Sequence, residues 1–294
     1  MHVLVAGCGW LGTELARALM ARGDRVTGVR RQPQRAAELA ALGVAPLALD
    51  LSAPDAARQL PADLDAVIAC QAAGGDGVEP YRRAYLEANR TLLAAAQRSG
   101  VRAFVYTGST GLFGQRDGCD VDEATPPAPS SPEAEVLVEA ERLVLGFGPA
   151  ARVVRLSGLY GPGRTGLVER VRSGALGLGS GDGAWMNFCH REDAVSMVLR
   201  ALDRGRPAAV YHGSDARPAC RREVVSWISG ALGVEPIMRG DLGAGRGGAN
   251  RRILSERTRA ELGITLAFPS FREGFTPLVV ERAPDREWSC AQQW

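Results

Sequence analysis

Residues 2–12 read His-Val-Leu-Val-Ala-Gly-Cys-Gly-Trp-Leu-Gly, and this short stretch decides the fold. The apolar run His2–Ala6 predicts a buried strand, and Leu11–Arg22 has the spacing of an amphipathic helix. Between the two lies a Gly-x-Gly-x-x-Gly pattern, formed by Gly7, Gly9 and Gly12. A glycine turn that joins a strand to a helix is the context in which this pattern binds the diphosphate of a dinucleotide.

Each glycine of this turn has an expected role. Gly7 permits the tight turn, Gly9 lets the backbone approach a diphosphate, and Gly12 allows the helix to pack closely. The helix begins near Trp10 and Leu11, and its N-terminus offers free N–H groups and the positive end of its dipole to phosphates. The alternative is a glycine turn that serves packing alone.

Outward from this turn, strands and helices alternate over the first 110 residues. This alternation predicts βαβ units, a parallel sheet and right-handed crossovers. The expected strands are His2–Ala6, Arg25–Val29, Val44–Leu49, Ala66–Ala69 and Val101–Thr107. The expected helices are Leu11–Arg22, Pro33–Leu42, Asp55–Leu60 and Pro80–Ser99.

The second half of the chain is less regular. Strands near 152–157 and 209–213 are expected to join the same sheet, and 240–248 is expected to be a loop. A polar tail is expected to end the chain. We therefore predict an α/β fold, a Rossmann-type doubly wound parallel sheet with a smaller C-terminal substrate lobe. The dinucleotide-binding domain is expected over residues 1–162, and the substrate lobe mainly over 163–294. Helices are expected at Glu133–Leu145, Arg191–Asp203, Cys220–Leu232 and Ser255–Leu262.

Composition excludes several classes of protein. The 294 residues are 46% hydrophobic with a net charge of +2, which argues against a disordered chain. No apolar run is long enough to span a bilayer, so we expect a cytoplasmic protein. All 35 basic residues are Arg and are offset by 33 acids, without a basic run, so neither nucleic acid nor a membrane is expected as a partner. Six Cys without a CxxC pair and three His predict free thiols and no metal site.

The choice of cofactor depends on the end of the second strand. An acidic residue that would bind a ribose 2′-hydroxyl is absent there, and Arg30 and Arg31 stand in its place. Guanidinium groups bind phosphate through planar, charge-assisted contacts, so the sequence favours NADP over NAD. The alternative is a pair of solvated arginines. Asp50 and Leu51, after the third strand, and Gln71, after the fourth, are expected near the adenine and ribose.

Several segments together resemble a known family. They are Gly7–Gly12, Asn89–Leu93, Val105–Gly114, Arg155–Arg164 and Asn187–Asp193. In this order and spacing the chain resembles the extended short-chain dehydrogenase/reductases, or NAD-dependent epimerase/dehydratase family. It is most similar to an atypical subgroup without the usual catalytic Tyr–Lys pair. Counted back from Ala140-Glu141, the Tyr position holds Glu133 and the Lys position holds Leu137, and the chain contains no Lys.

The resemblance implies roles for individual residues. Ser109, at the end of the fifth strand, would hydrogen-bond the substrate and is a candidate for both catalysis and cofactor binding, although such a residue also caps turns. Tyr160 would pass beside the nicotinamide, which makes it a candidate for both cofactor binding and catalysis. Glu133 would serve as acid or base if desolvated, or would simply stabilise the start of its helix. Tyr81 and Tyr85 could reach the site from the preceding helix, or pack on the sheet.

Substrate contacts are expected from Arg164, Asn187, Arg251 and Arg252, the last two as holders of an anionic group or as solvated arginines. We predict an NADP(H)-binding oxidoreductase or epimerase/dehydratase-like enzyme. It would act on a carbonyl or hydroxyl of a small substrate, by analogy a sugar nucleotide. The alternatives are a catalytically degenerate NADP-binding sensor and a lyase that retains its cofactor. A monomer or a homodimer is expected.

Overall fold

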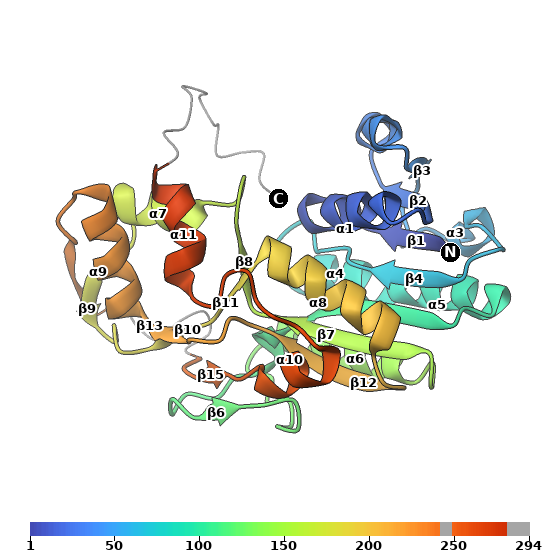
Figure 1. The fold of residues 1–294 in the computed structure, drawn as a ribbon. Helices are drawn as coiled ribbons and strands as arrows, with labels where there is room; N and C mark the ends of the chain where they lie inside the picture. The colour runs from blue at the N-terminus through green and yellow to red at the C-terminus, as the bar shows by residue number, and fades with distance from the viewer. Residues whose placement is uncertain (242–248, 281–294) are drawn as a thin grey trace.

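A seven-stranded parallel sheet forms the centre of the molecule (Figure 1), in a computed structural model that describes residues 1–241 and 249–280. Its strand order is β3-β2-β1-β4-β5-β7-β12, and every neighbouring pair is parallel. The predicted Rossmann-type fold is therefore confirmed. The strands are β1 (His2–Ala6), β2 (Arg25–Arg30), β3 (Ala45–Ala48), β4 (Ala66–Ala69), β5 (Ala103–Ser109), β7 (Ala151–Leu156) and β12 (Ala209–Gly213).

Helices cover both faces of this sheet. On one face α1 (Trp10–Ala21) and α8 (Arg191–Arg204) contribute to a core that includes Val3 and Val5. On the other face α5 (Ala88–Ser99) and α6 (Pro132–Leu145) pack on a core that includes Leu4. Because side chains alternate along a strand, the apolar run of β1 contributes to both cores, as expected of a parallel strand.

Two predicted helices are interrupted. The helix expected at 33–42 consists of α2 (Pro33–Ala37) followed by the 3₁₀ helix η1 (Glu38–Leu42). The helix expected at 80–99 begins earlier, as α4 (Val78–Tyr81), and passes through the π-helical segment η2 (Arg82–Glu87) before α5. A short helix, α3 (Ala56–Gln59), precedes β4.

Short strands and three helices build a second cluster beside the sheet. Its core contains Tyr160, Phe188, Phe271 and Phe275. The helix α11 was not predicted, because Pro277 stands inside it. Part of the loop expected at 240–248 and the expected polar tail lie outside the described residues. The cluster includes β8 (Gly158–Tyr160), α7 (Gly166–Arg172), β9 (Leu178–Ser180), β10 (Trp185–Met186), β11 (Phe188–His190), β13 (Ala219–Cys220), α9 (Arg221–Leu232), β14 (Met238–Asp241) and α11 (Phe271–Val280).

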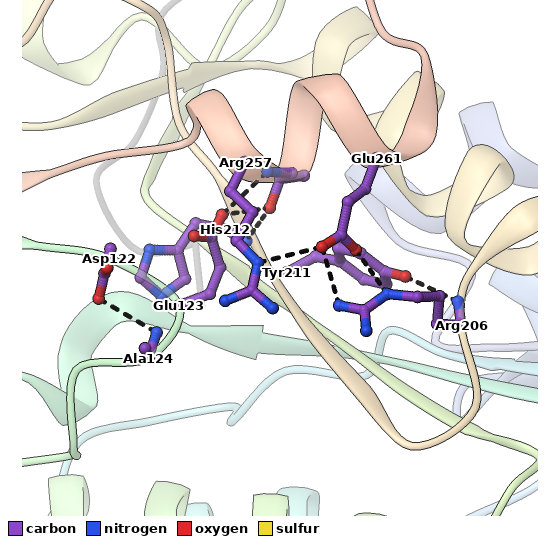
Figure 2. A network of polar contacts seen from close by, with 9 residues as sticks. Asp122, Glu123, Ala124, Arg206, Tyr211, His212, Arg257 and Glu261 are labelled. Atoms are coloured by element: carbon purple, nitrogen blue, oxygen red, sulfur yellow. Dashed lines mark hydrogen bonds and ion pairs between the residues drawn. The ribbon is translucent and has the colours of Figure 1, made fainter.

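Polar contacts fasten α10 (Glu256–Leu262) to β12, as Figure 2 shows. The backbone N–H of His212 donates to Thr258 Oγ1 at 2.7 Å, and the Thr258 hydroxyl donates to Glu123 Oε1 at 2.6 Å. Glu261 on the same helix accepts hydrogen bonds from Arg206 and Arg257. The remaining short elements are η3 (Thr110–Leu112), β6 (Asp120–Val121) and β15 (Arg252–Ile253).

The start of α8 is fixed by groups that act on backbone. His190 Nδ1 accepts a hydrogen bond from the Glu192 N–H at 3.4 Å, and burial lowers the pKa of His190 to about 4. Asp193 accepts from the N–H groups of Ala267 and Phe268 at 2.8 and 3.1 Å. Both side chains thus hold backbone segments at the start of α8. Within 1–241 and 249–280, the helices are all too short or too polar to cross a membrane.

Candidate functional site

A cavity of about 2170 Å³ lies at the carboxyl ends of the central strands. It is lined by residues that follow β1, β2, β4 and β5, and by residues of the second cluster such as Trp185 and Met186. The strand order reverses direction between β1 and β4, and this switch point is where open α/β sheets bind their ligands.

The glycine turn forms one end of this cavity. Gly7 has φ +83°, and a Cβ there would lie 2.5 Å from the backbone of Gln71. A Cβ on Gly12 would lie 2.3 Å from the Gly7 carbonyl oxygen, so this glycine allows α1 to pack against the turn. A Cβ on Gly9 would meet only the Gly7 oxygen, at 3.9 Å. The space above Gly9 is thus left open on the cavity side.

The first turn of α1 faces the same end. Gly9 is the residue before the helix, so no side chain caps it, and the first turn contains no acid. Trp10 and Leu11 line the cavity, and the Trp10 indole N–H donates to the Pro162 carbonyl oxygen at 2.8 Å. Uncapped N–H groups and an unopposed helix dipole suit an anion at this position.

The two arginines at the end of β2 have different surroundings. Arg30 is engaged by the protein itself, since its guanidinium forms an ion pair with Glu38 at 2.9 Å and contacts Thr13 and the Cys8 carbonyl. Arg31 is exposed, and its guanidinium reaches the loop after β4, next to Gly74. Both line the cavity, but only Arg31 makes no side-chain hydrogen bond within the described residues.

Asp50, Leu51 and Gln71 also line the cavity. Asp50 Oδ1 accepts from the Ser52 N–H and hydroxyl at 3.0 and 2.7 Å, and these bonds hold the pKa of Asp50 below its usual value. Its other oxygen pairs with Arg83 at 3.0 Å. Gln71 donates to Asn89 at 3.0 Å, whereas its Oε1 is buried without a partner in the described part of the chain.

Ser109 and Glu133 lie farther along the same cavity. Ser109 ends β5, and its Oγ accepts from the Gly111 N–H at 3.0 Å. Glu133 stands in the first turn of α6, where Ser131 caps the helix by accepting from the Ala134 N–H at 3.2 Å. Leu137, one turn further, faces the cavity too. Glu133 and Leu137 thus present a carboxylate and an apolar side chain to the cavity.

Tyr160 is not brought to this cavity. Its ring stacks on Phe275 with 4.3 Å between centroids and contacts Phe188 at 5.7 Å. The hydroxyl is buried without a partner in the described residues, and burial raises its pKa. It borders a small separate cavity of about 190 Å³. Tyr81 and Tyr85 do line the large cavity, with their rings edge to face at 5.3 Å.

The four expected substrate residues have different surroundings. Arg251 lines the cavity, and its guanidinium donates to the Thr110 carbonyl oxygen at 2.6 Å. Arg252 pairs instead with Asp120 and lies over the Trp185 ring at 5.0 Å. Asn187 uses both ends of its amide on the backbone of Arg251 and Ile253, at 3.0 and 2.8 Å. Asn187 thus positions Arg251. The fourth residue, Arg164, lines the cavity.

Several residues of the cavity were not predicted from the sequence, and two of them are Arg191 and Trp185. Arg191 lies in the segment Asn187–Asp193, which the resemblance includes, but no role was expected for it. No sequence pattern indicated that Trp185 would line the cavity. Trp185 lies in the short strand β10, and Arg191 begins α8 directly after β11. No local sequence pattern reveals that these two positions approach the glycine turn.

Comparison with known proteins identifies the family. The profile of the NAD dependent epimerase/dehydratase family matches residues 3–212, and the chain belongs to this family. The resemblance inferred from the motifs is thereby confirmed.

Individual relatives cover nearly the whole chain. Protein YeeZ of Escherichia coli strain K12 is 30% identical over 274 residues, with 91% of this chain and 96% of that protein covered. A 3-diazoavenalumate denitrifying reductase from a Streptomyces species is also 30% identical, over 93% and 99% of the two chains. The solved structure of MoeE5 in complex with UDP-glucose and NAD is 26% identical with a TM-score of 0.77, over 95% and 97%.

Proposed function

We propose that this chain is an NADP(H)-dependent oxidoreductase or epimerase/dehydratase-like enzyme that acts on a carbonyl or hydroxyl group of a small anionic substrate. The observation that carries this proposal is a cavity that runs from the glycine turn to Ser109, Glu133 and Arg251. It is large enough for a dinucleotide and a second molecule side by side. The naming of relatives as reductases and dehydratases supports the same class of reaction.

The residues at the sheet end of the cavity fit a dinucleotide. Gly9 leaves open space where a side chain would obstruct a diphosphate, and the buried Gln71 Oε1 lacks a donor within the described residues. Gly7, Gly9, Trp10, Leu11 and Gly12 would hold the diphosphate, and Asp50, Leu51 and Gln71 would surround the adenosine. Arg31, with Arg30 behind it, would bind a 2′-phosphate. When bound, a nicotinamide cofactor supplies hydride transfer.

At the other end, three side chains would act on the substrate. The Ser109 hydroxyl would donate to the substrate oxygen, since its Oγ already accepts from Gly111 N–H. The half-buried Arg251 would bind an anionic group such as a phosphate or a carboxylate. Glu133, on the first turn of α6, would take up or release the proton that accompanies hydride transfer.

Binding measurements test the cofactor. By calorimetry we expect NADPH to bind more tightly than NADH, and Arg31→Ala to weaken NADPH by about tenfold or more while NADH is unaffected. Arg58→Ala, an exposed arginine away from the cavity, is the matched control. A clear preference for NADH would contradict the choice of NADP, and absence of binding by either would contradict the whole proposal.

Turnover tests the chemistry. Nicotinamide absorbance is followed with a panel of carbonyl compounds and sugar nucleotides, and Ser109→Ala is expected to abolish turnover while Ser173→Ala, at the exposed end of α7, is not. Glu133→Gln should remove one limb of the pH profile. An unchanged profile would exclude Glu133 as the acid or base.

The second candidate is a cofactor-binding sensor without catalysis. It is favoured by Leu137, which presents an apolar side chain to the cavity at the position that the family resemblance assigns to Lys. Tight NADPH binding together with complete silence across the panel would favour this alternative.

A further inference from the structure

Two guanidinium groups lie over the ring of Trp10, the first residue of α1. The Cζ atom of Arg164 is 5.4 Å from the ring centroid, and that of Arg191 is 5.1 Å away. All three residues line the large cavity. These distances are those of cation–π contacts, which hold a guanidinium in a defined place.

The sequence brings these groups together from three elements. The turn after β8 contains Gly161 and Gly163, with φ +144° and +75°. This turn directs the Pro162 carbonyl to the Trp10 indole N–H and carries Arg164 to the ring. Arg191 is the first residue of α8, directly after β11. The turn after β8 and the start of α8 thus bring the two arginines to the glycine turn.

Arg191 shares its acidic neighbour with a second arginine. Glu14 is 3.8 Å from Arg191, and it also lies 3.9 Å from Arg17. The Nε atom of Arg191 is buried and lacks a hydrogen-bond partner within the described residues. The neighbouring first turn of α1 carries no acid and no capping side chain. Charge and geometry together call for an anion between the helix end and the two guanidiniums.

We propose that Arg164 and Arg191, held against Trp10, clamp the diphosphate of the dinucleotide. This inference rests on the proposed function and adds residues that the glycine pattern does not include. Two guanidiniums match a diphosphate because each presents N–H donors in a plane to phosphate oxygens. Since every nicotinamide dinucleotide carries the diphosphate, the clamp serves NADH and NADPH alike, unlike Arg31.

Three probes separate the diphosphate from the rest of the cofactor. NADPH contains the nicotinamide, the diphosphate and the 2′-phosphate. ADP-ribose has the diphosphate but neither the nicotinamide nor the 2′-phosphate. Adenosine 2′-phosphate has the 2′-phosphate but no diphosphate. Their dissociation constants are measured by calorimetry or competition for the wild type, Arg191→Gln, Arg164→Gln and Trp10→Phe. Arg17→Gln, on the same helix but outside the cavity lining, removes an equal charge as the matched control.

We expect Arg191→Gln and Arg164→Gln each to weaken NADPH and ADP-ribose by about ten- to a hundredfold, the loss of a charge-assisted hydrogen bond. The affinity of both arginine variants for adenosine 2′-phosphate should equal that of the wild type. The Arg17→Gln control should bind all three probes as tightly as the wild type. Trp10→Phe keeps a ring and loses the indole N–H, so we expect a loss below about tenfold. Arg164 is exposed, so its variant remains informative if Arg191→Gln does not fold.

The outcomes distinguish this inference from the function on which it rests. If the wild type binds NADPH and both arginine variants bind NADPH and ADP-ribose as tightly, the clamp is refuted and the proposed function stands. An equal loss for adenosine 2′-phosphate would also refute it, because the effect would then be a general disturbance of the site. If the wild type binds none of the probes, the proposed function itself fails.

Discussion

At the scale of single residues, Tyr160 is the sharpest case of a side chain whose surroundings decide its role. Its hydroxyl is buried without a partner in the described residues and abuts α11. A buried hydroxyl without a hydrogen bond costs about 1–3 kcal/mol. A phenol in this position is part of the core of the second cluster and does not line the large cavity.

We therefore expect Tyr160→Phe to leave the free energy of unfolding unchanged or to raise it by about 1 kcal/mol, since it removes an unsatisfied polar group. NADPH affinity and turnover should stay at the wild-type level. Urea unfolding, calorimetry and nicotinamide absorbance measure the three quantities. A folded variant with lost turnover would restore Tyr160 as a catalytic residue.

Asp215 predicts how stability depends on pH. It is 3% exposed, and burial, reinforced by the nearby charges of Asp193 and Glu273, raises its pKa to about 8. The folded state therefore holds a proton that the unfolded chain releases near pH 4. The stability associated with this group is present below pH 4 and is lost as the pH rises toward 8.

Asp215→Asn removes the titration, so we expect similar stability to the wild type at pH 4 and a gain of roughly 2 kcal/mol or more at pH 9. Urea unfolding at both pH values measures the difference. Asp76→Asn, at an exposed position, is the control and should change neither value. A constant difference at the two pH values would show that Asp215 does not titrate as inferred.

The role of a residue could be predicted from the sequence where it depends on the local backbone. It could be predicted less well where it depends on neighbours that only the folded chain brings close. The expected tasks of Gly7 and Gly12 match the close approaches in the structure, because a positive φ or a missing Cβ depends on the turn itself. Arg30 and Arg31 were indistinguishable in sequence. Their difference depends on Glu38 and Thr13, which only the folded chain brings to Arg30.

At the scale of elements, the junction between β1 and α1 has little room. A Cβ on Gly12 would lie 2.3 Å from the Gly7 carbonyl oxygen and 2.8 Å from Cys70 Sγ. A side chain there would push the helix away from the turn, and the N–H groups at its start would move with it.

We expect Gly12→Ala to destabilise the fold by about 1–3 kcal/mol, and to weaken NADPH by more than about tenfold. Gly230→Ala is the control, because Gly230 lies in α9 with open space around it. There the added methyl should stabilise the helix by roughly 0.5–1 kcal/mol. Thermal unfolding and calorimetry give both numbers. Tight NADPH binding by Gly12→Ala would contradict the role of the turn.

Elements with a regular pattern were predicted, and elements fixed by tertiary contacts were not. The strands of the sheet stand close to their expected positions because each is a short apolar run between turn residues. The helix α11 escaped prediction because Pro277 interrupts its pattern, and it is held by packing of Phe271 and Phe275. The π-helical segment η2 likewise has no signal in a sequence with helical spacing.

At the scale of the whole molecule, one wall of the cavity could be predicted from the sequence and the other could not. The alternation of strands and helices implies a parallel sheet, and therefore a ligand site at its carboxyl edge. The other wall comes from pairs of strands of two or three residues, such as β10 with β13, whose partners lie far apart in the sequence. Such contacts arise from packing of the second cluster, which no periodicity encodes.

This architecture predicts how the cofactor affects unfolding. Because the glycine turn and the second cluster meet at Trp10, a ligand between them stabilises both parts. At a free NADPH concentration of a hundred times its dissociation constant, binding adds about 2.7 kcal/mol, and we expect a single thermal transition to move up by roughly 5 °C. Differential scanning calorimetry with and without NADPH measures the shift, and Gly12→Ala, with its weakened site, should show a smaller one. Two transitions of which only one responds to NADPH would mean that the second cluster takes no part in holding the dinucleotide, because a ligand stabilises only the unit whose native state it contacts.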